Sequence, residues 1–259
     1  MDGTLLNDDL IITEHTKAAI ISAVESGAYF VVSTGRSMMS AARKLTGLEA
    51  LFDRDMPFIT FNGATVVMGK SKKILFNLSL EKYYAKQIYD IGLKRGIPVI
   101  MWIGEQLWVS HDCEAVREYQ KLSNAEVNII EDIERRSETG VSKMMWIDSP
   151  EKILSYQDEM NKYFNGSVNC HLSKPEFLEF VSEKASKGAA LREIGKVLGI
   201  DKSEIIAVGD SYNDLSMLEY AGLGVAMQNA SGDIKSLCQY VTLSNNHDGV
   251  AEVIEKFVL

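Results

Sequence analysis

The chain is poor in cysteine, has no long apolar run and carries no excess of basic residues. Its 259 residues include 3 cysteines, with 46% hydrophobic and 24% charged residues. The cysteines lie far apart and form no CxxC pair, which argues against a disulfide framework and against a cysteine zinc site. No apolar run approaches the roughly 18 residues of a membrane helix, and the N-terminus lacks the features of a signal peptide. We therefore expect a globular protein of the cytoplasm that has no membrane partner.

The net charge argues against a further class of binding partner. Lys and Arg number 27 and Asp and Glu number 36, which gives a net charge of −9. A broad surface that neutralises a phosphate backbone needs the opposite balance, so we expect no nucleic-acid partner. The length allows one large domain, or a core that carries an inserted smaller domain. We expect a monomer or a homodimer.

Short β-rich runs alternate with amphipathic stretches at both ends of the chain, which is typical of an α/β protein with a mostly parallel sheet. The flanks are expected to be two halves of one sheet domain. The expected helices there cover residues 14–26, 37–45, 187–198, 213–220 and 249–257, and the expected strands cover residues 28–33, 57–61, 204–208 and 224–226.

The middle of the chain follows a different pattern. Residues 65–77 have the pattern of a hairpin. After them, helices are expected over residues 80–95 and 150–164. Strands that favour antiparallel pairing are expected over residues 97–103, 107–110, 141–147, 167–172 and 177–182. We therefore expect a core domain over residues 1–79 and 184–259, with an inserted mixed α+β domain over residues 80–183.

An apolar strand that runs into a Gly-Asp turn and then a helix is the strongest single signal. Asp210 leaves the expected strand, and Asp214 lies in the first helical turn. Ligands of α/β proteins bind at such carboxyl ends of strands, and two carboxylates there suit a hard cation such as Mg²⁺. Acidic residues also cap helices routinely, so the two aspartates alone leave capping and metal binding equally open.

Thr34, Lys187 and Asp2 are three further candidates for the same edge of the sheet. Thr34 ends an apolar strand and could hold a phosphate with backbone N–H groups, although an ordinary turn explains it as well. Lys187 opens a helix, where its charge opposes the helix dipole, although a solvent-facing lysine is the more common explanation. Asp2 is a candidate acid or base beside Gly3, which permits a tight turn.

The order of these groups along the chain is more specific than any one of them. They are Asp2-Gly3-Thr4-Leu5-Leu6, Thr34-Gly35-Arg36, Asn62-Gly63-Ala64, Lys187-Gly188 and Gly209-Asp210-Ser211-Tyr212-Asn213-Asp214. In this order the chain resembles the haloacid dehalogenase superfamily, and within it the Cof-type phosphatases with a large inserted cap, class IIB. The resemblance implies a Rossmann-like core, an inserted cap that sets selectivity, and hydrolysis of phosphomonoesters with Mg²⁺.

The resemblance also implies roles for individual residues. The expected catalytic residues are Asp2 as acid and base, Thr34 as a ligand of the phosphoryl group, and Lys187 as the group that neutralises charge. The expected metal site consists of Asp2, through its backbone carbonyl, with Asp210 and Asp214. The expected substrate-binding residues are Gly35, Arg36, Asn62, Gly63, Asn213 and Asn245.

The substrate implied by the resemblance is a small phosphorylated metabolite, such as a sugar phosphate, flavin mononucleotide or pyridoxal phosphate. Selectivity would come from the inserted domain, where the candidates are Trp102, Trp108, His111, Arg117, His171 and Lys174. None of these forms a motif, and packing explains them as well. Lys143, beside Met144, is expected to face solvent.

The chain departs from the family at the first residue of the motif Asp-x-Asp-Gly-Thr. Met1 stands at x, so the nucleophilic Asp and the strand that carries it would precede Met1. We expect such an upstream strand, because deleting a central strand of about 5–6 residues exposes two ladder edges and opens the core. The alternatives are a phospholigand-binding protein with impaired turnover, and a phosphomutase that shares the nucleophile.

Overall fold

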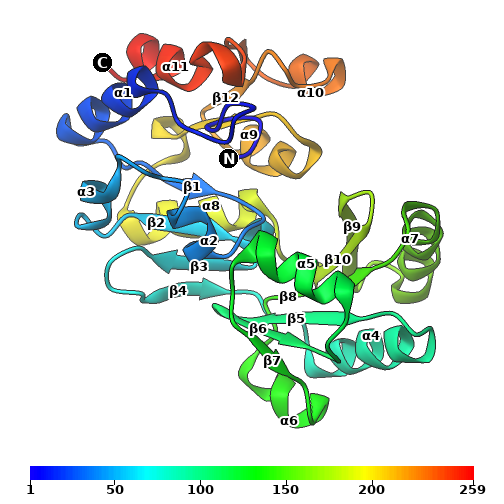
Figure 1. Cartoon of the computed structure of the whole chain (residues 1–259). Coiled ribbons are helices and arrows are strands. Elements are labelled where there is room, and N and C mark those ends of the chain that lie inside the picture. Colours follow the sequence, from blue (N-terminus) through cyan, green and yellow to red (C-terminus); the bar gives the residue numbers. More distant parts are fainter. The chain divides into compact units, whose positions relative to one another are not determined.

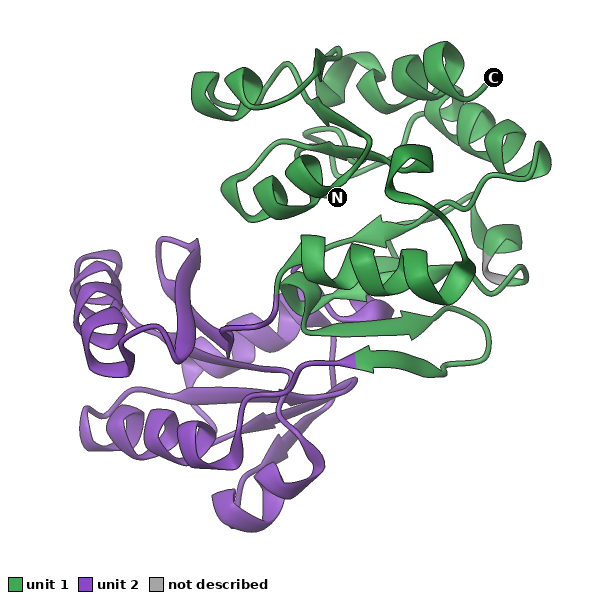
Figure 2. Cartoon of the chain, turned by 180° about the vertical axis from the view of Figure 1, so that it is seen from behind, with its two compact units in different colours: residues 1–34, 41–76, 186–259 green, residues 35–40, 77–185 purple. Residues whose placement is uncertain are grey.

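The computed structural model describes the whole chain except Phe52, and it contains two compact units (Figures 1 and 2). Unit 1 comprises residues 1–34, 41–76 and 186–259. Unit 2 comprises residues 35–40 and 77–185. The inserted domain was expected over residues 80–183. The main part of unit 2, residues 77–185, begins and ends within a few residues of those positions, and unit 2 also includes the short segment 35–40.

Unit 1 combines two ladders of strands with helices on the outside. The first ladder has the order β1-β2-β3-β4, with β1 and β2 parallel and β2 and β3 antiparallel. The second has the order β11-β12-β13 and is parallel throughout. Their strands are β1 (Val32–Ser33), β2 (Pro57–Thr60), β3 (Thr65–Met68), β4 (Ile74–Asn77), β11 (Ile206–Gly209), β12 (Leu223–Ala226) and β13 (Tyr240–Val241).

Four helices of unit 1 end within one residue of the predicted position. The helix predicted over residues 37–45 ends at Ala42, and the helices Glu49–Phe52 and Gly232–Ser236 were not predicted. Helix α1 begins behind Thr13, whose side chain accepts a hydrogen bond from the Thr16 N–H, and it stops just before Ser26-Gly27. The helices are α1 (Glu14–Glu25), α3 (Glu49–Phe52), α8 (Lys187–Leu198), α9 (Leu215–Tyr220), α10 (Gly232–Ser236) and α11 (Gly249–Phe257), and α2 (Met38–Ala42) runs across the boundary between the units.

The two flanks of the chain lie in one unit, as expected, but their strands form two separate ladders. Among the described residues, β1 pairs with β2 and β11 pairs with β12, but no strand joins β1 to β11. The paired part of the first expected strand is also short, because only Val32 and Ser33 of residues 28–33 form ladder bonds. The two ladders nevertheless share one apolar core, in which Leu191 and Ile194 of α8 pack with Ile59 of β2 and Ala207 of β11.

Unit 2 is built on a six-stranded sheet in the order β7-β6-β5-β8-β10-β9, antiparallel except between β6 and β7. Its strands are β5 (Val99–Ile103), β6 (Gln106–Val109), β7 (Val127–Ile129), β8 (Lys143–Ile147), β9 (Val168–Lys174) and β10 (Phe177–Ser182), and its helices are α4 (Lys82–Lys94), α5 (Glu114–Ser123), α6 (Ile133–Arg136) and α7 (Pro150–Phe164). Three of these, α5, β7 and α6, were not predicted.

The core of unit 2 follows from the alternation of its strands. Met144 and Trp146 of β8 pack with Phe180 of β10 on one face of the sheet, where Ile88 of α4 and Ile153 of α7 cover them. These five side chains are almost fully buried. No helix in the described part of the chain is both long enough and apolar enough to span a membrane.

Candidate active site

A buried ion pair joins the start of α8 to the turn after β11. The Nζ atom of Lys187 lies 2.6 Å from Oδ1 of Asp214, and each side chain is only 4% exposed. Lys187 can occupy the first turn of the helix because Ser186 caps it, with the Ser186 side chain accepting a hydrogen bond from the Ala189 N–H. The ion pair therefore offsets the unfavourable position of a cation at a helix N-terminus.

The second oxygen of Asp214 orders the turn that carries Asp210. Oδ2 of Asp214 accepts hydrogen bonds of 3.0 Å from the backbone N–H groups of Asp210 and Ser211. Burial raises the pKa of Asp214, but the Lys187 ammonium and the amino terminus of Met1 outweigh it, so the pKa of this carboxyl lies below its ordinary value. Asp214 is thus a charged residue that positions both Lys187 and the Asp210 turn.

Asp210 contacts the loop at the start of the chain. The hydroxyl of Thr4 donates a hydrogen bond to Oδ1 of Asp210, and the hydroxyl of Ser211 donates one to Oδ2 over 2.9 Å. Gly3 lies so close that a Cβ atom there would be 2.6 Å from Oδ2 of Asp210. The Asp2-Gly3-Thr4 turn therefore lies against the carboxyl end of β11, as the motif order predicts.

Two predicted residues connect the first ladder to this cluster. The Thr34 N–H bonds to the Ile59 carbonyl, and the Thr34 carbonyl accepts from the Asn62 N–H. The Asn62 side chain in turn accepts a hydrogen bond of 3.1 Å from Nδ2 of Asn213. Phe61 and Asn62 both adopt positive φ angles, of 50° and 57°. Consecutive residues in this region are uncommon outside glycine, and such backbone strain concentrates at functional sites.

Gly63 explains how the strained loop fits against α8. Its φ angle is +96°, and a Cβ atom there would be 2.1 Å from the Ser186 carbonyl oxygen. Only glycine allows this approach. The loop of Asn62 and Gly63 thus packs directly against the residue that precedes Lys187.

The last predicted residue, Asn245, contacts the N-terminal loop from the other side. Its Nδ2 donates to the Leu6 carbonyl and to Oδ1 of Asp8, each over 3.1 Å. Its backbone N–H donates to Asn229, whose side chain donates to the Gly3 carbonyl over 2.8 Å. Asn245 therefore supports the turn of Asp2 rather than lying apart from it.

The structure groups most of the predicted residues in unit 1. Hydrogen bonds join Thr34 to Asn62 and Asn62 to Asn213. Asp214, the next residue along the chain, pairs with Lys187. The exceptions are Gly35 and Arg36, which group with unit 2. The side chain of Asp2 is exposed at the edge of the cluster.

Sequence reasoning missed several side chains that support the cluster. Thr4 stands inside the motif that led to Asp2, so its contact with Asp210 had a signal in the sequence. Asn229 and Ser186 had none, because an asparagine after a strand and a serine before a helix are ordinary turn and cap residues.

The donors near Asp210 fit a hard cation. Among the described residues no group of three or more His, Cys, Asp or Glu side chains is gathered around one point. Mg²⁺ does not require such a group, because it is commonly held by one or two carboxylates together with water and substrate oxygens. Asp210 supplies a partly exposed carboxylate beside the backbone of the Asp2 turn, whereas the carboxylate of Asp214 is buried and paired with Lys187. The residues therefore fit Mg²⁺, with Asp210 as the carboxylate donor.

In unit 2 the structure corrects one expectation. Lys143 was expected to face solvent, but it is 3% exposed and its Nζ lies 2.7 Å from Oε1 of Glu179. His171 approaches the other oxygen of Glu179, with 3.4 Å from Nε2 to Oε2. Burial opposes the charged form of Glu179, yet the Lys143 ammonium and His171 lower its pKa to about 2. The expectation fails because Lys143 lies on the face of β8 that meets Glu179 on β10.

Comparison with known proteins shows the family to which the chain belongs. A family model for haloacid dehalogenase-like hydrolases matches residues 1–254. The chain belongs to this family. The α/β fold class expected from the sequence is confirmed, and so is the assignment to a phosphatase branch of the superfamily.

Several relatives cover nearly the whole chain. YxeH of Bacillus subtilis (strain 168), provisionally named a phosphatase, is 32% identical over 261 residues, which is 100% of this chain and 96% of that protein. The 5-amino-6-(5-phospho-D-ribitylamino)uracil phosphatase YcsE of the same organism is 29% identical and covers 100% of this chain and 94% of its own length.

Solved structures agree. A haloacid dehalogenase-like hydrolase from Bacteroides thetaiotaomicron has a TM-score of 0.88 at 27% identity, covering 98% of this chain and 96% of that chain. The subclass IIB sugar phosphatase BT4131 has a TM-score of 0.83 at 25% identity, covering 99% and 96%. The chain is therefore a hydrolase of the phosphatase type within this superfamily.

Proposed function

We propose that this protein is a Mg²⁺-dependent hydrolase of small phosphomonoesters, of the sugar phosphate, flavin mononucleotide or pyridoxal phosphate class, that works in the cytoplasm as a monomer or homodimer. The observation that carries the proposal is the buried pair of Lys187 and Asp214, next to Asp210 and the Asp2 turn. A buried cation held beside a carboxylate at the carboxyl ends of strands suits a dianionic phosphoryl group.

The nucleophile in this proposal is an Asp immediately before Met1. The amino group of Met1 interacts electrostatically with Lys187, Asp214 and Asp210. A residue joined to that nitrogen would therefore have its side chain within reach of the same cluster. This placement supports the reading of Met1 as the middle residue of the Asp-x-Asp-Gly-Thr motif.

The proposed reaction has two displacements. A carboxylate oxygen of the upstream Asp attacks phosphorus, the bond to the ester oxygen breaks, and Asp2 gives its proton to that leaving oxygen. Asp2 then removes a proton from water, whose oxygen attacks phosphorus and breaks the bond to the aspartyl oxygen, releasing phosphate.

The remaining residues bind and position. Lys187 neutralises charge on the nucleophile and the phosphoryl group, and Thr34 donates a hydrogen bond to a phosphoryl oxygen. Asp210 and the Asp2 backbone carbonyl would hold Mg²⁺, which when bound stabilises the negative charge of the phosphoryl group. Asp214 keeps Lys187 charged and the Asp210 turn ordered.

The substrate class rests on the resemblance and on the relatives. YcsE is named for a phosphoribitylamino-uracil, and BT4131 for a sugar phosphate. Both leaving groups carry several hydroxyls, so we place polyol and sugar phosphates first among the substrates to test. Gly35, Arg36 and the residues of unit 2 are the proposed source of selectivity.

The test uses a protein that carries Asp before Met1 behind an apolar strand, assayed with p-nitrophenyl phosphate and then with sugar phosphates. We expect turnover that requires Mg²⁺ and is lost in Asp210→Ala. Absence of Mg²⁺-dependent turnover, or full turnover in Asp210→Ala, contradicts the proposal. Binding of phosphate esters without turnover would instead favour the phospholigand-binding protein, and transfer of phosphate to a sugar would favour a phosphomutase.

A further inference from the structure

The segment that follows Thr34 in the sequence belongs to unit 2. Residues 35–40 group with residues 77–185, while Thr34 itself belongs to unit 1. Thr34 is the residue that the proposed function assigns to a phosphoryl oxygen. Because the next residue is joined to it directly, the contacts that hold residues 35–40 bear on the position of Thr34.

Glu105 holds the start of α2 with both of its carboxylate oxygens. Oε1 accepts a hydrogen bond of 2.8 Å from the Met38 N–H, and Oε2 accepts one of 3.0 Å from the Met39 N–H. The Ser40 N–H donates to the Ser37 hydroxyl over 3.3 Å. The first three N–H groups of the helix are therefore bonded, and a carboxylate at this end also favours the helix dipole.

Helix α2 depends on this support because it is short. It has five residues, whereas isolated helices below about 12–15 residues are marginal in water. Its own first turn contains no acidic residue. The carboxylate comes instead from a position 67 residues after Met38 in the sequence. The inserted domain therefore sets where α2 begins.

Glu105 lies at the tip of the hairpin of β5 and β6. Ile103 pairs with Gln106, so only Gly104 and Glu105 form the turn. Gly104 has a φ angle of +56°, and a two-residue turn that begins with glycine at positive φ is a common hairpin connection. Both strands are interior strands of the six-stranded sheet, which fixes the place of the turn. Glu105 is itself exposed, so a substitution there leaves the core of unit 2 intact.

A second contact holds the other end of the segment. Nζ of Lys143 donates a hydrogen bond of 3.4 Å to the Gly35 carbonyl. The same ammonium lies 2.7 Å from Oε1 of Glu179, and the two side chains are only 4% and 5% exposed. A lysine in such a buried pair has little freedom to move, so it fixes the carbonyl that it contacts. Residues 35–40 are thus held at Gly35 and again at the start of α2.

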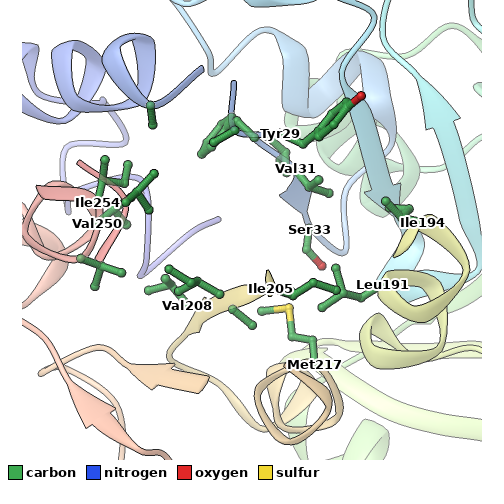
Figure 3. Close-up of a pocket in the computed structure, with 18 of the residues that line it drawn as sticks. Tyr29, Val31, Ser33, Leu191, Ile194, Ile205, Val208, Met217, Val250 and Ile254 are labelled. Atoms are coloured by element: carbon green, nitrogen blue, oxygen red, sulfur yellow. The ribbon is translucent and has the colours of Figure 1, made fainter. Parts of the chain in front are cut away.

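On the other side of Thr34 the chain is held by unit 1. The Thr34 N–H bonds to the Ile59 carbonyl of β2. Val31 and Ser33, which precede it, line an apolar cavity of about 600 Å³ in unit 1 (Figure 3). The backbone of Thr34 is therefore fixed from unit 1 on its N-terminal side and from unit 2, through residues 35–40, on its C-terminal side.

We propose that Glu105 is a positioning residue of the phosphoryl-binding loop, which by capping α2 fixes residues 35–37 and, through them, the Thr34 hydroxyl. Lys143 supports the same loop at Gly35. The inserted domain therefore contributes to binding of the phosphoryl group that all substrates share, in addition to selectivity among leaving groups. The inference rests on the proposed role of Thr34, and Glu105 itself contacts neither substrate nor metal in it.

The test measures hydrogen exchange, and the binding of inorganic phosphate in the presence of Mg²⁺, on the 259-residue chain. Glu105→Ala removes both acceptors, whereas Glu105→Gln keeps one neutral acceptor. We expect Glu105→Ala to speed exchange at the Met38 and Met39 N–H groups by about tenfold or more. It should also raise the dissociation constant of phosphate by about tenfold, with Glu105→Gln between the two.

Two further variants make the test specific. Glu118→Gln, an exposed change of the same charge on α5, should alter neither measurement. Thr34→Val removes the hydroxyl and keeps the shape of the side chain. In that background Glu105→Ala should raise the phosphate dissociation constant by less than about threefold, because the two residues act through one contact. A loss of overall stability does not produce this difference, since unfolding lowers the number of binding sites and not the affinity of each.

Three results would overturn the proposal. Unchanged exchange at Met38 and Met39 in Glu105→Ala would show that the carboxylate does not hold the start of α2. A full tenfold effect of Glu105→Ala in Thr34→Val would show that Glu105 does not act through Thr34. Tighter binding of phosphate in Glu105→Ala would make the carboxylate a competitor of the anion. Absence of phosphate binding by the unmodified chain contradicts the proposed function instead, and exchange at Met38 and Met39 still tests the role of Glu105.

Discussion

Lys187 and Asp214 form an ion pair of 2.6 Å between the first turn of α8 and the turn after β11. The pair links two segments that lie 27 residues apart in the sequence. Because Asp214 also accepts hydrogen bonds from the Asp210 and Ser211 N–H groups, its removal affects both the cation and the turn that carries Asp210.

The first prediction concerns the loss of this counterion. Asp214→Asn leaves Lys187 buried without its charged partner, and removing one member of a buried pair is expected to reduce the free energy of unfolding by about 3–5 kcal/mol. In the protein that carries Asp before Met1, phosphatase activity should fall by roughly 100-fold or more, because Lys187 loses the partner that positions it. Urea unfolding and steady-state kinetics measure the two effects.

The matched control is another pair on the same helix. Lys196 and Glu193 are 2.7 Å apart, but the lysine side chain is largely exposed. Glu193→Gln should change the free energy of unfolding by less than about 1 kcal/mol and leave activity unchanged. Equal effects of the two substitutions would contradict the role assigned to Asp214.

The second prediction concerns the close approach at Gly63. Gly63→Ala introduces a Cβ atom 2.1 Å from the Ser186 carbonyl oxygen, in addition to the strain of a positive φ angle. Gly199→Ala has the same kind of strain, with φ of +70°, but nothing lies within 4 Å of its Cβ atom.

We expect Gly199→Ala to lower the free energy of unfolding by about 1–2 kcal/mol, the left-handed penalty alone. Gly63→Ala should be clearly more destabilising and should also reduce activity, because Ser186 precedes Lys187. Thermal unfolding of both variants measures the difference. If the two variants lose the same stability, the loop does not pack against Ser186 as described.

The third prediction concerns the metal. If Asp210 is the carboxylate donor for Mg²⁺, saturating Mg²⁺ should stabilise the protein by mass action, by about 2.7 kcal/mol at 100 times the dissociation constant. Asp210→Asn should abolish this shift, while Asp158→Asn, an exposed change on α7, should retain it. Thermal unfolding with and without Mg²⁺ is the measurement, and a full shift in Asp210→Asn would rule out this site.

Local pattern predicted much of the fold. The periodicity of apolar residues gave α7, α8 and α11 with the observed bounds, and the same holds for β10. It missed α5, whose sequence from Glu114 to Ser123 is mostly polar, with Val116 as its one fully buried apolar side chain. Periodicity detects helices that bury a continuous stripe, and α5 does not bury one.

The site was predicted by the order of motifs rather than by periodicity. The turns after strands predicted positions for Thr34, Asn62, Asp210 and Asp214, because the carboxyl ends of parallel strands meet at one edge. Lys187 was a candidate because it opens a helix. No sequence motif predicted the side-chain contacts between distant segments. The Lys143–Glu179 pair joins two strands across 36 residues, and neither neighbour of Lys143 in the sequence indicates that its side chain is buried.

The last prediction concerns acid stability of unit 2. The pKa of Glu179 is about 2 in the folded protein, compared with an ordinary value of 4.5. A carboxyl whose pKa is lower when folded contributes stability that is fully present above its unfolded pKa and is lost as the pH falls through the folded pKa. We therefore expect unit 2 to lose stability progressively between pH 4.5 and about 2.

Tryptophan fluorescence can measure this loss, because Trp102, Trp108 and Trp146 all lie in unit 2. Glu179→Gln should unfold more readily at neutral pH, by about 3–5 kcal/mol, since Lys143 is left buried without a counterion. It should also show a flatter dependence of stability on pH in the acid range. Glu118→Gln, an exposed change on α5 of unit 2, is the control and should keep the acid dependence of the unmodified chain. An unchanged acid profile in Glu179→Gln would mean that this ion pair does not govern the stability of unit 2 at low pH.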